Sequence, residues 1–111
     1  ALKLFAQKWG KMGIFSKKTK YNSINTKYKF NEDKILTKLK VYIDNTYDQH
    51  YSTDKIQATE FIIDSGHGEG FCIGNIIKYA KRYGKKAGKN ELDLLKIIHY
   101  SIILLGSDEN N

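Results

Sequence analysis

The chain contains no proline in 111 residues, and this absence constrains the fold more than any other feature of the sequence. Proline breaks helices because it lacks a backbone N–H and its ring clashes with the preceding turn. Glycine, the next strongest interruption, gathers in short clusters, so helices can run long between them. The sequence therefore predicts an all-α fold, a compact bundle of about four helices with a basic N-terminal extension.

Apolar residues spaced three and four apart indicate where the helices lie. The helices are expected over residues 31–47, 54–64, 71–82 and 91–105. Asn31, Thr53 or Asp54, and Asn90 are the expected N-caps, because short polar side chains accept hydrogen bonds from the free N–H groups of a first turn. Gly84 is the expected stop of the third helix. The fourth helix is apolar on more than one face, which predicts that it is central and the most buried.

The positive charge of the chain is unevenly distributed. Residues 1–30 hold eight lysines and no acid, whereas residues 31–111 hold eleven basic against twelve acidic residues. We therefore expect a basic N-terminal arm over 1–30, a helical domain over 31–106 and a polar tail over 107–111. The arm either contacts nucleic acid, a host protein or an anionic surface, or it is an extension that packs on itself.

The chain has a single cysteine, Cys72, so an internal disulfide is excluded and a reducing cytosol is the expected setting. Its apolar neighbours indicate a small core residue rather than a nucleophile. No secretory signal is expected, because no uninterrupted apolar stretch follows the N-terminal charges. No membrane span is expected either, since polar residues interrupt the most apolar run, residues 92–105.

The third helix combines an apolar stripe with a cationic one. Ile73, Ile76, Ile77 and Ala80 recur at helical spacing, and Lys78, Arg82 and Lys85 do so on a neighbouring strip. Between residues 78 and 89 there are six basic residues and no acid. Such a surface favours phosphate binding. The alternative is the ordinary solvated face of an amphipathic helix.

Other patterns are weaker. Gly66, Gly68 and Gly70 resemble a phosphate-cradling turn, but they lack the lysine of a P-loop and favour a plain interhelical turn. The three histidines lack metal-ligand spacing, and His99 is expected to be a core residue. Glu60, Asp64 and Asp93 could hold Mg²⁺ in an all-α nucleotide hydrolase.

Asp93 has a second interpretation, since it lies three positions before Lys96, the spacing of a simple helical ion pair.

The order of residues over about 49–105 resembles a known family. The matching pattern is His50-Tyr51, an apolar helix, Gly74-Asn75-x-x-Lys78-Tyr79-x-x-Arg82-x-Gly84-Lys85-Lys86, and a last helix that contains Asp93-Leu94-x-Lys96. It is similar to short phage-encoded proteins described as nucleotide kinases. Leu92 and Tyr83 depart from that pattern, and the first 48 residues are not covered.

The resemblance implies a phage protein of deoxynucleotide metabolism in the cytoplasm of the infected host cell. It implies binding of nucleotide phosphates and transfer of a phosphoryl group from a nucleoside triphosphate to a nucleoside monophosphate, with Mg²⁺ as a candidate cofactor. The candidate catalytic residues are His50 and Asp93. The candidate substrate-binding residues are Tyr51, Asn75, Lys78, Tyr79, Arg82, Lys85, Lys86 and Lys96.

Phosphoryl transfer requires mainly cations and positioning, which these residues can supply. A domain this small can hardly enclose two nucleotides alone, so a homo-oligomer is expected. The alternatives are a non-catalytic nucleotide-binding protein, the metal-dependent hydrolase, and a module that binds nucleic acid or a host protein through the arm.

Overall fold

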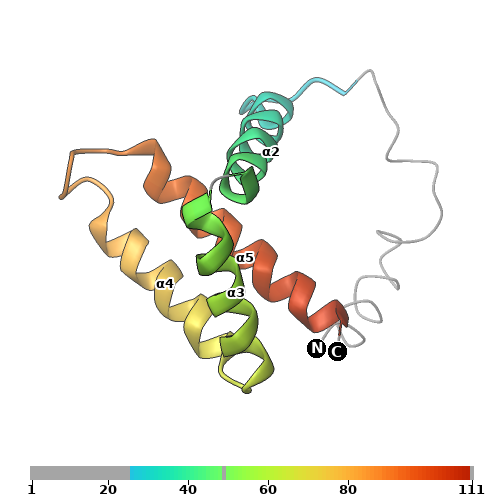
Figure 1. Ribbon diagram of the computed structural model, residues 1–111. Helices are drawn as coiled ribbons and strands as arrows, with labels where there is room; N and C mark the ends of the chain where they lie inside the picture. The colour runs from blue at the N-terminus through green and yellow to red at the C-terminus, as the bar shows by residue number, and fades with distance from the viewer. Residues whose placement is uncertain (1–25, 49, 111) are drawn as a thin grey trace, which may run out of the picture.

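The computed structural model describes residues 26–48 and 50–110, without the side chains of 50–53 and 108–110. It contains four helices, α2 (Glu32–Asp48), α3 (His50–Asp64), α4 (Gly68–Arg82) and α5 (Glu91–Asn110), shown in Figure 1. The described residues form no strand, and the all-α prediction is confirmed. The arm predicted over residues 1–30 lies almost wholly outside the described residues.

Helix α2 begins where predicted, but not through the predicted cap. Asn31 adopts a left-handed conformation with φ of 58°, and its backbone oxygen accepts a hydrogen bond from Ile35 N. The side chain that acts at this terminus is Glu32, whose Oε1 accepts a hydrogen bond from Phe30 N at 2.9 Å. An acidic residue in the first turn also suits the positive end of the helix dipole.

The predicted start of the second helix was wrong. We expected residues 50–53 to be a break with a cap at Thr53 or Asp54, but α3 already begins at His50. No proline or glycine lies between residues 31 and 65, so nothing in the backbone requires a longer interruption. Hydroxyl residues are also tolerated inside these helices. The Thr59 hydroxyl, for example, donates to the Lys55 carbonyl oxygen at 2.9 Å.

The turn between α3 and α4 is shorter than expected, and α4 correspondingly longer. Gly66 has φ of 91°, a conformation that L side chains rarely adopt, and it reverses the chain. Gly68 is buried as the first residue of α4, and a Cβ there would lie 3.0 Å from Ile63 Cγ1. Gly68 therefore permits a close approach to α3, and it and Gly70 belong to a helix rather than to a phosphate-cradling loop.

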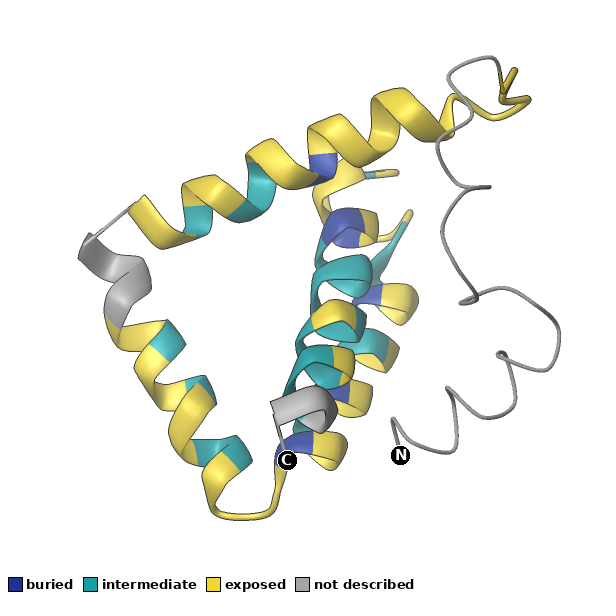
Figure 2. Cartoon of the chain, turned by 90° about the vertical axis from the view of Figure 1, so that its right-hand side faces the viewer, coloured by how far each residue is buried: buried dark blue, intermediate teal, exposed yellow. Residues whose placement is uncertain are grey.

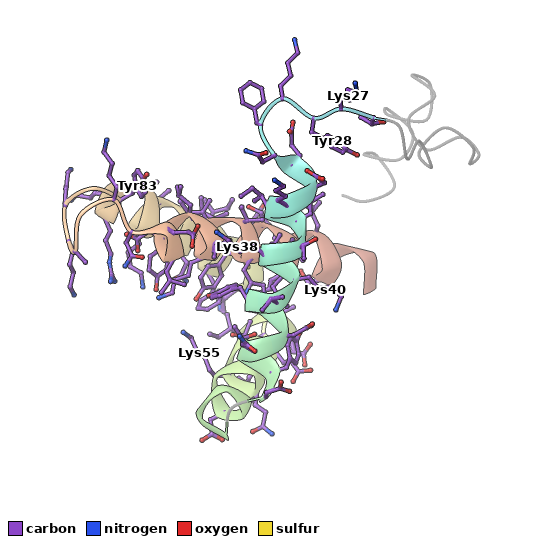
Figure 3. All side chains as sticks on the ribbon, turned by 90° about the horizontal axis from the view of Figure 1, so that it is seen from above. Lys27, Tyr28, Lys38, Lys40, Lys55 and Tyr83 are labelled. Atoms are coloured by element: carbon purple, nitrogen blue, oxygen red, sulfur yellow. The ribbon has the colours of Figure 1, made fainter. Side chains whose placement is uncertain are left out.

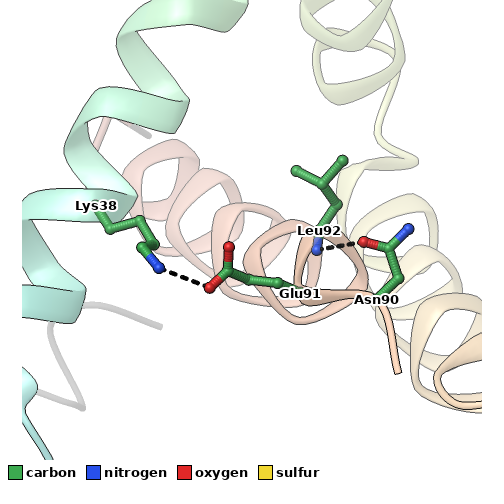
Figure 4. Close-up of polar contacts among 4 residues, drawn as sticks. All are labelled: Lys38, Asn90, Glu91 and Leu92. Atoms are coloured by element: carbon green, nitrogen blue, oxygen red, sulfur yellow. Dashed lines mark hydrogen bonds and ion pairs between the residues drawn. The ribbon is translucent and has the colours of Figure 1, made fainter. Parts of the chain in front are cut away.

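The predicted ends of α4 and α5 are confirmed at two positions. Gly84 follows the end of α4 with φ of 85°. Asn90 Oδ1 accepts a hydrogen bond from Leu92 N at 2.9 Å and caps α5 (Figure 4). Helix α5 continues to Asn110, so residues 107–110, which we expected in a polar tail, belong to it.

Helices α4 and α5 form an antiparallel pair, because residues with decreasing numbers in α4 contact residues with increasing numbers in α5. Arg82 meets Asp93, Tyr79 meets Lys96, and Phe71 meets Tyr100. Helix α2 crosses α5 (Figures 1 and 3), and Lys38 Nζ binds Glu91 Oε1 at 2.7 Å (Figure 4). Helix α5 contacts both α2 and α4, but each of the other described helices also contacts two neighbours, so the central place of α5 stays a prediction.

The core of the described part is small (Figure 2), with Leu39, Cys72, Tyr79 and Leu95 as its buried apolar residues. Cys72 is fully buried, which confirms the prediction of a core residue, and burial raises the pKa of its thiol. None of the four described helices combines the length and the apolar character that crossing a bilayer requires.

Candidate functional site

The two flanks of α4 differ in chemistry. Successive residues of an α-helix turn by about 100°, so Lys78 and Arg82 lie on one flank and Ile76 and Ala80 on the other. Tyr79 lies between the flanks and is buried against α5. The cationic residues are therefore brought to one edge of the α4–α5 pair instead of surrounding the helix.

Three cations surround the ring of Tyr79. Lys78 Nζ lies 4.6 Å from the ring centroid, Lys96 Nζ 4.9 Å and Arg82 Cζ 5.8 Å. The ring is stacked on Tyr100, with centroids 6.2 Å apart and planes 14° apart. Cations are attracted to the face of an aromatic ring, so Tyr79 helps to hold together groups that would otherwise repel one another. We call these five residues the Tyr79 cluster.

The pKa of the Tyr79 phenol reflects the same excess of positive charge. Burial raises the pKa of Tyr79, but the ammonium groups of Lys96 and Lys78, with a smaller effect from Lys55, bring it below its ordinary value. The pKa of Tyr42 and that of Tyr100 are raised, in both cases first by burial and then by the charge of an ionised Tyr79. The cluster therefore favours a negative charge at its centre.

Most of these cations lack an anionic partner. Among the described side chains, no carboxylate forms an ion pair with Lys55, Lys78 or Lys96. The three lysines come from three helices, α3, α4 and α5, and Figure 3 shows Lys55 on the side of the α4–α5 pair where α3 lies. Their charges are therefore free to meet an anion from solution.

Arg82 is the exception, because it is paired with Asp93. Its Nε lies 3.4 Å from Asp93 Oδ1, and Asp93 is only 1% exposed. The second carboxylate oxygen, Oδ2, is buried and has no hydrogen-bond partner within the described part. Asp93, proposed above as catalytic, is thus placed as the buried counter-ion of Arg82, and the described ion pairs join it to Arg82 rather than to Lys96.

The other predicted site residues are not all brought to this cluster. Asn75 Nδ2 donates to Phe71 O within α4 at 2.9 Å. Lys85 and Lys86 are exposed in the loop after α4, and their backbone N–H groups bond to the Arg82 carbonyl oxygen. The side chains of His50 and Tyr51 lie outside the described residues.

Several residues near the cluster were not predicted as site residues. Lys55 affects the pKa of both Tyr79 and His99, and the Tyr42 ring contacts His99 edge-to-face with centroids 5.9 Å apart. Burial, and then the charge of Lys55, lower the pKa of His99. Its half-buried place fits the predicted core histidine. A single lysine on α3 carries no sequence signal, because its position depends on how α3 packs.

A magnesium site built from Glu60, Asp64 and Asp93 finds no support in the geometry. Within residues 26–48 and 50–110, no three His, Cys, Asp or Glu side chains gather closely enough to hold a metal ion. The described arrangement is suited to electrostatic capture of an anion.

These features define a small all-α protein with a cationic and aromatic cluster between its helices. The profile of the family described as "Protein of unknown function (DUF3310)" matches residues 45–101, just over half of the chain. The chain belongs to this family. The resemblance to phage nucleotide kinases was therefore wrong as an identification, because the family that matches has no known function and no nucleotide kinase family is shown.

Two further comparisons add little. Over 73 residues the chain is 32% identical to alanine–tRNA ligase of Blochmanniella floridana, a match that covers 61% of this chain. The chain spans only 8% of the length of that relative. No solved structure matches.

Proposed function

We propose that this chain binds the phosphate groups of a nucleotide at the Tyr79 cluster. The observation that carries the proposal is the convergence of Lys78 and Lys96 on the Tyr79 ring, with no carboxylate partner for either lysine among the described side chains; the charge of Lys55 on α3 also lowers the pKa of Tyr79. Two unpaired ammonium groups close to one ring form a positive field that a multiply charged anion would neutralise. Tyr79 itself is buried and stacked on Tyr100, so it supports the lysines rather than offering a face for a base.

The proposal is limited to binding because the geometry supports binding most directly. Asp93 is buried against Arg82, which leaves it poorly placed to exchange protons with a ligand. A more specific hypothesis is that the chain also transfers a phosphoryl group from a nucleoside triphosphate to a nucleoside monophosphate, with Mg²⁺ as the cofactor. A reducing cytoplasmic setting belongs to the same proposal and is based on the single cysteine.

Calorimetric titration with nucleoside mono- and triphosphates, with and without Mg²⁺, tests binding. Lys78→Gln and Lys96→Gln should each lower the affinity by roughly tenfold to a hundredfold, the value of one charge-assisted contact at about 1.5–3 kcal/mol. Lys81→Gln is the matched control, since Lys81 has the same charge and lies exposed on the same helix. It should change the affinity by less than about twofold, because Lys81 makes none of the described contacts with the Tyr79 ring and an exposed charge contributes little.

Equal effects of Lys78→Gln and Lys81→Gln would show a general electrostatic attraction and contradict the proposal. Absence of heat with every nucleotide, confirmed by equilibrium dialysis, would also contradict it. The same mixtures, analysed for products, show whether a phosphoryl group moves from the triphosphate to the monophosphate.

A further inference from the structure

The flank of α4 opposite the cations is apolar and exposed. Ile73, Ile76 and Ala80 lie on this flank, about half a turn from Lys78 and Arg82. Ile73 is 42% exposed, although an isoleucine in the middle of a helix normally packs against a neighbour. The partner of this flank is therefore not supplied by the described helices.

The corresponding flank of α5 has the same character. Leu94 and Leu105 lie on the flank opposite Lys96 and are 43% and 51% exposed, and Ile97 lies between this flank and the side that faces α4. Because α4 and α5 are antiparallel and their cationic flanks share one side, their apolar flanks share the other. Figure 2 shows α3 across from the α4–α5 pair. These six residues form one surface, which we call the apolar face.

We propose that the apolar face is the interface with a second copy of this chain, related by a two-fold axis. Two antiparallel helix pairs that pack face to face make a four-helix bundle, and an uncharged apolar surface is complementary to itself. The proposal does not depend on the ligand proposed for the Tyr79 cluster.

The distribution of charge favours a second copy over other occupants. The chain has a formal charge of +7, so two copies repel unless their cations are kept apart. The six residues of the apolar face are uncharged, and Lys78, Arg82 and Lys96 lie on the opposite flanks. The exposed Glu69 borders the face, on the same flank of α4 one turn before Ile73, and it adds no positive charge. Docking through this face leaves both Tyr79 clusters away from the interface. A nucleic acid would require cations on the face, and its six residues include none.

The exposed area of this face supplies part of the apolar surface that a dimer interface buries. A methylene group corresponds to about 30 Å² of apolar surface, so a four-carbon side chain has about 130 Å². At exposures of 42%, 43% and 51%, Ile73, Leu94 and Leu105 together offer roughly 180 Å² of apolar area. A standard interface buries about 800 Å² per partner, of which about 450 Å² is apolar, so these three residues supply roughly two-fifths. Ile76, Ala80 and Ile97 add to it.

Sedimentation velocity on the full chain between about 1 and 100 μM tests this proposal. We expect a dimer in the wild-type chain. Ile73→Glu and Leu94→Glu should each weaken the dimer at least about a hundredfold, because a carboxylate would be buried in an apolar interface. Leu36→Glu is the matched control, since Leu36 is 63% exposed on α2 and lies outside the face. It should change the dissociation constant less than about threefold.

Circular dichroism establishes that each variant keeps its helices. If a glutamate variant loses them, Ile73→Ser and Leu94→Ser take its place and should still weaken the dimer at least about tenfold. A wild-type chain that is monomeric at the highest concentration would overturn the proposal. It would also be overturned if Leu36→Glu dissociated the dimer as strongly as Leu94→Glu, or if the well-folded variants of the apolar face stayed dimeric.

Discussion

Removing Arg82 from its ion pair with Asp93 should destabilise the fold more than removing Asp93. Asp93 is 1% exposed, whereas the side chain of Arg82 is 32% exposed. After Asp93→Asn, Arg82 can turn toward water and keep its charge solvated. After Arg82→Gln, the carboxylate of Asp93 stays buried and loses its only counter-ion among the described residues.

The magnitudes follow from the geometry. At 3.4 Å and an effective dielectric constant of about 20, the attraction is about 5 kcal/mol before desolvation is subtracted. Breaking a buried pair costs about 3–5 kcal/mol when the remaining charge cannot escape, which is the case for Arg82→Gln. For Asp93→Asn we expect about 2 kcal/mol, because Arg82 recovers part of its hydration. That loss corresponds to a melting temperature lower by about 10 °C.

Urea denaturation followed by circular dichroism measures these differences. Asp44→Asn is the matched control, since it removes the carboxylate of the exposed pair with Lys40, whose side chains are 76% and 58% exposed for Lys40 and Asp44. It should cost at most about 0.5 kcal/mol. The double variant Asp93→Asn/Arg82→Gln should cost less than the sum of the single variants, because the second change removes a charge that the first left unpaired.

Two results would refute this reasoning. If Asp93→Asn cost no more than Asp44→Asn, the buried pair would not contribute as its geometry indicates. If Arg82→Gln were milder than Asp93→Asn, burial would not decide which partner matters. A separate consequence concerns the candidate site. Asp93→Asn frees the charge of Arg82, so the affinity for phosphate should rise even as stability falls.

Three other predictions concern titration and the backbone. Tyr79 should ionise at a pH below the ordinary phenol pKa of 10.0. An ultraviolet titration should show this early ionisation in the wild-type chain and not in Tyr79→Phe. An identical curve for the two would contradict the prediction. The pKa of His99 lies below its ordinary value of 6.5, so the unfolded chain takes up a proton at a higher pH than the folded chain, and stability should fall as the pH drops below about 6.5. Lys55→Gln should raise the pKa of His99 in an NMR titration. An unchanged pKa would exclude the effect of Lys55. Gly66→Ala should destabilise the fold by about 1–2 kcal/mol in the same denaturation assay, because the φ of Gly66 is 91°. Gly74→Ala should stabilise it by about 0.5–1 kcal/mol, because an added Cβ at this helical position meets free space. Equal effects of the two substitutions would be inconsistent with the backbone geometry.

The helices were largely predictable from local patterns, and the errors have local causes. Ser52 and Thr53 are residue types that favour caps, so they were interpreted as a break, although α3 already runs through them. Gly68 and Gly70 were interpreted as a turn for a similar reason. Gly68 is instead buried against Ile63 of α3 as the first residue of α4, and such a contact between two helices leaves no trace in local propensity.

The candidate site was predictable only where it lies on one helix. Spacing along α4 places Lys78 and Arg82 on one flank, and the structure does the same. Lys55 comes from another helix, and its position near Tyr79 depends on how α3 meets the α4–α5 pair. Helical periodicity describes each helix by itself, so a site that several helices share is visible only after packing is known.

The same packing indicates that stability and the proposed binding would compete in this protein. Lys78 and Lys96 lie within 5 Å of one ring centroid, so their mutual repulsion is present whether or not a ligand is bound. Stacking on Tyr100 and attraction to the Tyr79 ring offset part of that repulsion, and Asp93 neutralises Arg82 from the buried side. A carboxylate on the open side would neutralise the lysines better, but it would also occupy the position of an incoming anion. An unpaired group of lysines held by aromatic rings is therefore the arrangement expected of a site that must remain ready to bind.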